Sequence, residues 1–320
     1  MQRILVIRGG AIGDFILTLP ALKLLRENFP SAHIEILGYK QINALAEGRF
    51  YANATRSIDY APLSRFFARD TELPADLVEY FGGFNLIISY LFDPDEIFAA
   101  NLRRASAARL ILGTPRFSEH EHAAVQLAQP LTELGLHLND AAAFLFPSEE
   151  DRNSAIHFLQ GMDSPVIAIH PGSGSEKKNW PLENWIQFGE YVQESGNNLL
   201  VIGGEADEKQ TAQLRSRWEG KAVRFATNLP LPHLAAVLEN TIFVGHDSGI
   251  SHVAAAAGAR CILLFGPTDP AVWAPVNGNV KVLSAPEGDL ARLPPANVIK
   301  ALVILSEARD LANSPAPSNS

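Results

Sequence analysis

Arg3-Ile-Leu-Val-Ile-Arg-Gly-Gly-Ala-Ile-Gly-Asp14 joins an apolar segment to a glycine-rich loop, and this junction decides the fold. Residues 3–7 are apolar on both faces, as in a parallel strand that is covered by helices on each side. After the loop, residues 14–28 have apolar positions at helical spacing, namely Ile16, Leu19, Leu22 and Leu25. A buried strand, a glycine loop and a helix in this order are typical of α/β proteins with parallel sheets.

The same order of elements recurs along the chain, which predicts two domains of this kind. In the first half we expect further strands at residues 33–38, 85–90 and 109–113. The pattern restarts with a strand at 165–169 and a second glycine-rich loop, and further strands are expected at 199–202, 222–225, 241–244 and 261–265. The predicted fold is therefore α/β, with Rossmann-like domains at 1–155 and 156–313, and a tail at 314–320 that its composition predicts to be disordered.

Composition limits the classes of function. The 320 residues carry a formal net charge of −9, which argues against nucleic acid as a partner. No segment approaches the ~18 consecutive apolar residues of a membrane span, and the first apolar run ends at Arg8, too short for a signal peptide. We therefore expect a cytoplasmic protein. The single cysteine, Cys261, lies in an apolar run and is expected to be buried and inert.

Arginines are concentrated in the first half of the chain. The group comprises Arg56, Arg65, Arg69, Arg103, Arg104, Arg109 and Arg116. Such a group is either ordinary solvated surface or a patch that binds an anionic acceptor, and the sequence leaves both interpretations open.

The loop from Arg8 to Asp14 lies at the carboxyl end of the first strand, where open α/β sheets bind ligands. It is not a dinucleotide fingerprint, because G-x-G-x-x-G would need glycine in place of Arg8, and the second strand is followed by Gly38-Tyr39-Lys40 without an acidic residue. A nicotinamide-dependent enzyme is therefore disfavoured. Asp14 is either a helix N-cap or a catalytic carboxylate, and the two roles are compatible.

Val244-Gly-His-Asp-Ser-Gly-Ile-Ser-His252 predicts a strand, a polar turn and the start of a helix. Backbone N–H groups near Ser248 and Gly249 would then form a site for a diphosphate at the helix N-terminus. Asp247 and Ser248 also suit helix capping. His246, Asp247 and His252 lack further matching ligands, so we expect no metal here. His120 and His122 are expected at the surface.

His170-Pro-Gly-Ser-Gly-Ser-Glu-Lys-Lys-Asn-Trp-Pro181 is a second candidate phosphate loop. Small residues such as Ser173 let the backbone approach a phosphate, and Lys177 or Lys178 can supply positive charge. The Gly-Lys-Ser/Thr spacing of a Walker loop is missing. The tryptophans that follow are equally well explained by packing.

Taken in order, these segments resemble family 9 glycosyltransferases, the lipopolysaccharide heptosyltransferases. The resemblance covers nearly the whole chain and is strongest at residues 8–22, at Lys178-Asn-Trp-Pro181 and at residues 245–270, which include Phe-Gly-Pro-Thr-Asp-Pro. It implies a GT-B fold, in which two Rossmann-like domains face each other across a cleft. It also implies inverting, metal-independent transfer from a nucleotide sugar, typically ADP-heptose, to an anionic lipid-linked saccharide.

The resemblance also implies roles for individual residues. The catalytic aspartate falls on Asp14, and the basic residue before it falls on Arg8, which we assign to acceptor binding. Apart from the resemblance, the concentration of basic residues in the first half adds Arg56, Arg65 and Arg69 as candidates for acceptor binding. Donor binding falls on Ser173, Lys178 with Lys177 as the alternative, either Glu205 or Glu208 for the ribose, and Asp247, Ser248, Gly249 and His252. No cofactor beyond the nucleotide sugar is expected.

Two alternatives to transfer are a sugar-nucleotide epimerase of the same fold and a non-catalytic nucleotide-sugar-binding protein. The presence of Asp14 argues against the second. A lipid-linked acceptor would also bring the protein transiently to the inner face of the cytoplasmic membrane. The sequence leaves the sugar, the base and the acceptor open.

Overall fold

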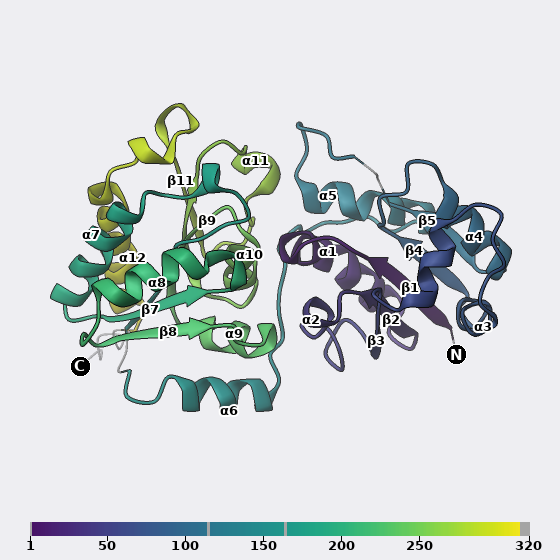
Figure 1. Ribbon diagram of the computed structural model, residues 1–320, viewed down its shortest axis with the longest axis horizontal. Coiled ribbons are helices and arrows are strands. Elements are labelled where there is room, and N and C mark those ends of the chain that lie inside the picture. Colours follow the sequence, from purple (N-terminus) through teal and green to yellow (C-terminus); the bar gives the residue numbers. More distant parts are fainter. Residues whose placement is uncertain (1, 114–115, 163–164, 314–320) are drawn as a thin grey trace, which may run out of the picture.

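The computed structural model describes residues 2–113, 116–162 and 165–313, which form two α/β lobes side by side (Figure 1). The first sheet has the order β3-β2-β1-β4-β5, with strands β1 (Arg3–Arg8), β2 (His33–Gly38), β3 (Ala54–Ser57), β4 (Leu86–Ser89) and β5 (Arg109–Leu112). The second has the order β11-β10-β9-β6-β7-β8, with β6 (Val166–His170), β7 (Asn198–Gly203), β8 (Val223–Thr227), β9 (Ile242–His246), β10 (Arg260–Phe265) and β11 (Val280–Ser284). All strand pairs are parallel.

Helices cover both faces of each sheet, which explains why the central strands are apolar throughout. In β1, Ile4 and Val6 pack into the core between the sheet and α1, whereas Leu5 and Ile7 pack into the core on the opposite face of the sheet. The helices of the first lobe are α1 (Ile12–Asn28), α2 (Lys40–Asn43), α3 (Ala75–Gly82), α4 (Ile97–Ala105) and α5 (Ala123–Ala128). Those of the second are α6 (Glu149–Phe158), α7 (Leu182–Glu194), α8 (Glu208–Arg217), α9 (Leu231–Leu238), α10 (Gly249–Ala256), α11 (Pro270–Trp273) and α12 (Pro295–Asn313).

The predicted fold class is confirmed, with three differences in detail. Strands β3 and β11 were not predicted, because both are edge strands whose mixed sequences lack a buried apolar run. Helix α1 begins at Ile12 rather than at Asp14. The predicted domain boundary at 155/156 falls inside α6, which packs on α9, and the predicted tail lies outside the described residues. Cys261 is fully buried, as predicted.

The two lobes meet where the N-terminal ends of α1 and α10 pack together. Gly249, the first residue of α10, lies so close to α1 that a Cβ atom there would be 2.8 Å from Ile12 Cβ and 3.0 Å from Gly13 N. A Cβ at Gly13 would in turn lie 3.4 Å from His252 Cδ2. Glycine at both positions thus allows two helix N-termini to approach face to face.

A second contact between the lobes corrects the prediction that His122 lies at the surface. Its Nδ1 accepts a hydrogen bond from Ala124 N–H at the start of α5, and its Nε2 donates to the Ala274 carbonyl oxygen at 2.8 Å. His120, by contrast, is exposed as expected. No helix in the part of the chain that the structure describes is long and apolar enough to cross a membrane.

Replacing Gly249 with alanine should destabilise the protein. Glycine to alanine in a helix is ordinarily favourable, but here the new Cβ would clash with Ile12 and with the backbone of Gly13. We expect the melting temperature to fall by roughly 2–6 °C, the effect of modest overpacking in a chain of this size. The control is Gly278→Ala, at an exposed turn where nothing lies within 4 Å of the added Cβ. Equal melting temperatures for both variants would contradict the close approach of α1 and α10.

Candidate active site

The first half of the candidate site is the turn between β1 and α1, which fixes the carboxylate of Asp14. Asp14 is the third residue of α1, and Ala11 occupies the N-cap position that the sequence offered for Asp14. Asp14 Oδ2 accepts a hydrogen bond from Ala11 N–H at 2.9 Å. Gly10 has φ +95°, and a Cβ there would lie 2.7 Å from Asp14 Oδ2. Glycine is therefore needed at position 10 for the carboxylate to fold back over the turn.

Arg8 holds the same carboxylate from the other side. Its side chain is buried, with Nε donating to Thr18 Oγ1 at 2.9 Å and Nη2 lying 3.6 Å from Asp14 Oδ1. Thr18 in turn donates to the Asp14 carbonyl oxygen. Burial lowers the pKa of Arg8, and the charges of Asp14 and Tyr90 counteract this. Tyr90, which the sequence analysis missed, has a buried phenol oxygen without a hydrogen-bond partner among the described residues.

The second half of the site contains a short ion pair that joins two loops. Lys178 Nζ lies 2.6 Å from Asp247 Oδ2, which also accepts a hydrogen bond from Thr268 Oγ1 at 2.8 Å. Lys178 is half-buried, whereas Lys177 is exposed. Thr268 had no role in the sequence analysis, although it lies in the Phe-Gly-Pro-Thr-Asp-Pro segment that carried the resemblance.

A buried hydrogen-bonded chain supports the start of α10. His170 Nε2 donates to Asp207 Oδ2 at 2.9 Å, which leaves Nδ1 to accept from the hydroxyl of Ser248, 3.3 Å away. Burial would raise the pKa of Asp207, but its hydrogen bond with His170 lowers it overall. Ser248 is the N-cap of α10, where its Oγ accepts from Ser251 N–H. The link between these three side chains could not be predicted, because His170, Asp207 and Ser248 lie far apart in the sequence.

His246 fixes the loop that carries Lys178. Its Nε2 accepts a hydrogen bond from Trp180 N–H at 2.8 Å, and its Nδ1 is 3.3 Å from the Gly172 carbonyl oxygen. Complete burial lowers the pKa of His246 to about 3, so the ring is neutral at physiological pH. Trp180 and Trp185 are fully buried beside it, which confirms that these tryptophans serve packing.

His252 lies between the two halves of the site. Burial lowers its pKa, while Asp247 and Asp14 oppose the shift and Lys178 adds to it. A Cβ atom on Gly13 of the first lobe would lie 3.4 Å from His252 Cδ2, so this ring of the second lobe packs against the start of α1. The residues that the sequence placed on separate loops, among them Asp14, Lys178 and Asp247, therefore converge on the contact between α1 and α10.

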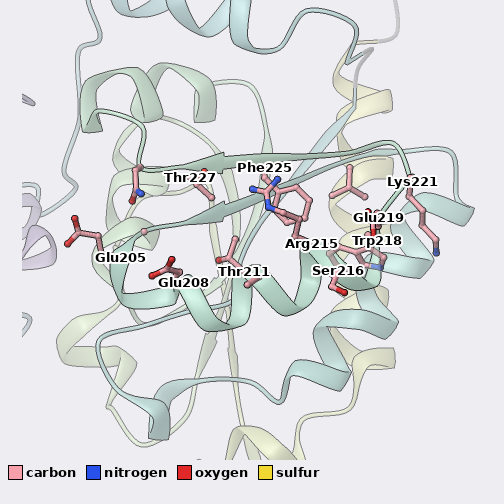
Figure 2. Close-up of a pocket in the computed structure, with 15 residues that line it drawn as sticks. Glu205, Glu208, Thr211, Arg215, Ser216, Trp218, Glu219, Lys221, Phe225 and Thr227 are labelled. Carbon is pink, nitrogen blue, oxygen red and sulfur yellow. The ribbon is translucent and has the colours of Figure 1, made fainter.

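A groove of about 730 Å³ runs between α8 and the edge strand β8 (Figure 2). Glu205 and Glu208 both lie at one end of it, beside the carboxyl ends of β7 and β8, whereas Lys221 lies at the other end. Ser173 lies on the loop after β6, where its Oγ contacts Asn179 Oδ1 at 2.7 Å and helps to shape the loop.

The predicted basic patch is more ordered than a loose surface cluster. Arg56 lies on β3 and stacks on the rings of Tyr80 and Tyr60, at 4.2 and 5.1 Å from the ring centres. Arg65 lies on the short helix η1 (Ala61–Phe67) and donates to the Glu72 carbonyl oxygen, and Arg69 is exposed just beyond it. Among the described residues, no three His, Cys, Asp or Glu side chains are placed to hold a metal ion.

Comparison with known proteins identifies the class to which this fold and site belong. Residues 114–300, more than half of the chain, match Glycosyltransferase family 9 (heptosyltransferase). The chain is 26% identical over 300 residues to lipopolysaccharide heptosyltransferase 1 of Pseudomonas aeruginosa, covering 84% of this chain and 80% of that protein. With heptosyltransferases of Haemophilus influenzae and Escherichia coli, the match spans 40% and 48% of their length.

Two solved structures have the same fold. A family 9 glycosyl transferase from Veillonella parvula superposes with a TM-score of 0.79 at 22% identity, covering 95% of this chain and 97% of that one. An E. coli heptosyltransferase, WaaC, solved with ADP-2-deoxy-2-fluoro heptose, gives 0.69 at 20% identity, covering 94% and 99%. The chain belongs to glycosyltransferase family 9, and its two lobes are the Rossmann-like domains of the GT-B fold.

The buried imidazole of His246 should make stability depend on pH. Its pKa is about 3 in the fold against 6.5 as the ordinary value, so the unfolded chain binds more protons between these values. Stability is therefore fully present above about pH 6.5 and is lost as the pH falls towards 3, with a slope of at most about 1.4 kcal/mol per pH unit for this ring. His246→Gln, which keeps an acceptor for Trp180 N–H, should make the slope shallower in urea unfolding at pH 7, 6 and 5.

The control for that experiment is His120→Gln, at an exposed position. Its slope should match that of the unmodified protein. Because the comparison uses slopes, a constant loss of stability from the glutamine does not affect the outcome. An unchanged slope in His246→Gln would contradict a buried neutral ring.

Proposed function

We propose that the protein is an inverting glycosyltransferase that moves heptose from ADP-heptose to a lipopolysaccharide core or a related surface saccharide. The family description and the names of the relatives support the sugar and the acceptor class. The E. coli heptosyltransferase structure with an ADP-heptose analogue supports the donor. The enzyme would work in the cytoplasm and meet its lipid-linked acceptor at the inner face of the membrane.

One observation carries this proposal. Asp14 lies in the first turn of α1, and the Lys178–Asp247 ion pair lies just before the start of α10. Because the N-termini of these two helices pack together, the two groups meet although they come from opposite lobes. A base for an acceptor hydroxyl and a cation for a diphosphate thus lie on the two sides of one contact. Transfer between two substrates that bind to different lobes needs this arrangement.

The proposed step is a single displacement. Asp14 takes the proton from an acceptor hydroxyl while that oxygen attacks the anomeric carbon of the donor sugar. The bond from the anomeric carbon to the diphosphate oxygen breaks on the opposite face, and the nucleoside diphosphate leaves with the electron pair. The hydrogen bond from Ala11 N–H and the charge of Arg8 fix the carboxylate in direction, which favours its action as a base.

The leaving diphosphate develops negative charge, which Lys178 and the N-terminus of α10 are suited to stabilise. Helix N-termini carry about half a positive charge and present unpaired N–H groups. Ser248 and Gly249 lie at this end of α10, and His170 holds the Ser248 hydroxyl in place. This charge stabilisation would make a metal ion unnecessary. Glu205 or Glu208 would bind the ribose hydroxyls.

Asp14→Asn should abolish most of the turnover and leave the fold intact. The amide oxygen still accepts the Ala11 N–H bond, so the fold should stay intact, and the melting temperature should fall only by the effect of losing the charge beside Arg8. Loss of a general base should lower the single-turnover rate about 10²–10⁴-fold, measured as transfer from ADP-heptose to heptose-deficient lipopolysaccharide. Asp95→Asn, at an exposed position, is the control. A rate within a few-fold of the unmodified enzyme would exclude Asp14 as the base and favour the epimerase or binding-protein alternatives.

Lys178→Ala should weaken ADP binding far more than Lys177→Ala. Loss of a charge-assisted contact to phosphate costs about 10- to 100-fold in Kd, and it leaves Asp247 unpaired near the diphosphate. Lys177 is exposed, so its removal should change Kd less than about twofold. Calorimetry with ADP measures both Kd values. Addition of EDTA to the unmodified enzyme should change neither ADP binding nor turnover. A larger effect at Lys177, or loss of turnover with EDTA that magnesium restores, would contradict this donor site.

A further inference from the structure

A cavity of about 510 Å³ opens at the carboxyl edge of the first sheet, next to Asp14. It is lined by the Gly9-Gly10 turn after β1, by residues that follow the ends of β2, β3 and β4, and by residues of η1 and α5. On the proposed function, the acceptor hydroxyl reaches Asp14 through this cavity. The side chains around it therefore select the acceptor.

Aromatic rings dominate the walls of the cavity. Five of its 13 lining residues are aromatic, against 8% of the whole chain: Tyr39, Phe67, Tyr90, Phe92 and Phe117. Three of these rings are exposed although they are large and apolar, with exposed fractions of 40% for Tyr39, 46% for Phe67 and 65% for Phe92. Apolar rings left in water around a cavity are typical of a surface that a ligand covers.

The charges of the lining do not suit an anion. Arg8 is its only cation among the described residues, and its guanidinium already contacts Thr18 and Asp14. Asp14 and Asp59 bring two carboxylates, which makes the formal charge of the lining negative. Arg56 and Arg65 are not part of the lining and are held by the contacts described above. Among the described residues, a phosphate or carboxylate inside the cavity would meet two carboxylates and a single cation, whose charge the neighbouring carboxylate of Asp14 already offsets.

We propose that the acceptor unit that enters this cavity is an uncharged sugar ring. It lies with one C–H face against the exposed rings, of which Phe92 is the most prominent. Asp59 accepts hydrogen bonds from its hydroxyls, and one hydroxyl is presented to Asp14. The inference rests on the proposed function and narrows it: anionic groups of a larger acceptor stay outside the cavity, where Arg69 and its neighbours lie.

The test compares two small probes by ligand-observed saturation-transfer NMR on the full-length protein. One is methyl α-mannopyranoside, and the other is its 6-phosphate, which has the same ring with added negative charge. The neutral probe should bind with strong saturation of its ring C–H protons, and the phosphate should bind about tenfold more weakly. Equal or tighter binding of the phosphate, or no binding of the neutral probe, would overturn the inference.

Two variants locate the binding in the cavity. Phe92→Ala should weaken the neutral probe about three- to tenfold, as expected for loss of one aromatic face. Phe144→Ala, which removes an exposed ring outside the cavity, is the matched control and should have no effect. Asp59→Lys should abolish the discrimination against the 6-phosphate. Unchanged discrimination in Asp59→Lys, or equal effects of the two phenylalanine variants, would also overturn the inference.

These readouts are independent of turnover. If the phosphate is preferred while Asp14→Asn still abolishes transfer, the acceptor inference fails and the proposed function stands. If Asp14→Asn transfers normally, the proposed function fails whatever the probes show. The two failures are therefore distinguishable.

Discussion

The close approach of α1 and α10 is the contact on which the arrangement of the site depends. Each helix begins directly after a buried central strand, so its N-terminus is fixed by the sheet behind it. Gly13 and Gly249 allow these ends to meet without intervening side chains, and the contact lies at the junction of the two lobes. Because the first turn of each helix carries functional groups, a shift at this contact would move Asp14 relative to Asp247. The geometry of the site is therefore a property of the domain interface.

The two lobes use different chemistry beside this contact. The second lobe holds its loops with buried imidazoles, in which His170 and His246 act as hydrogen-bonding connectors. Buried polar networks of this kind are rigid when their members are satisfied. The ion pair between Lys178 and Asp247 belongs to the same loops as this network, but it is partly exposed. The first lobe instead combines one buried arginine with a cavity walled by aromatic rings.

This difference suits the two substrates that we propose, a nucleotide sugar at the second lobe and a sugar acceptor at the first. A nucleoside diphosphate carries most of its recognisable chemistry as charge, so helix N-terminal N–H groups and a lysine are suited to bind it. A sugar ring has an apolar face and a rim of neutral hydroxyls, for which aromatic rings and carboxylates are better suited. Both sites lie at the carboxyl ends of parallel strands, where crossover loops of an α/β sheet leave room for ligands. One architecture thus supplies two distinct sites through its loops.

The sequence by itself determined the fold class, most of the strands and the loops of interest, because buried parallel strands and glycine turns are local signals. It missed the edge strands β3 and β11, since their mixed sequences contain no buried apolar run. It named Asp14, Lys178, Asp247 and Ser248, but it gave no role to Tyr90, Asp207 or Thr268, and it could not show that His170, Asp207 and Ser248 are joined by hydrogen bonds. Only the tertiary structure decided that His122 bridges the lobes and that Arg56, Arg65 and Arg69 lie outside the cavity of Asp14. These features depend on distances between residues far apart in the chain, which no local pattern encodes.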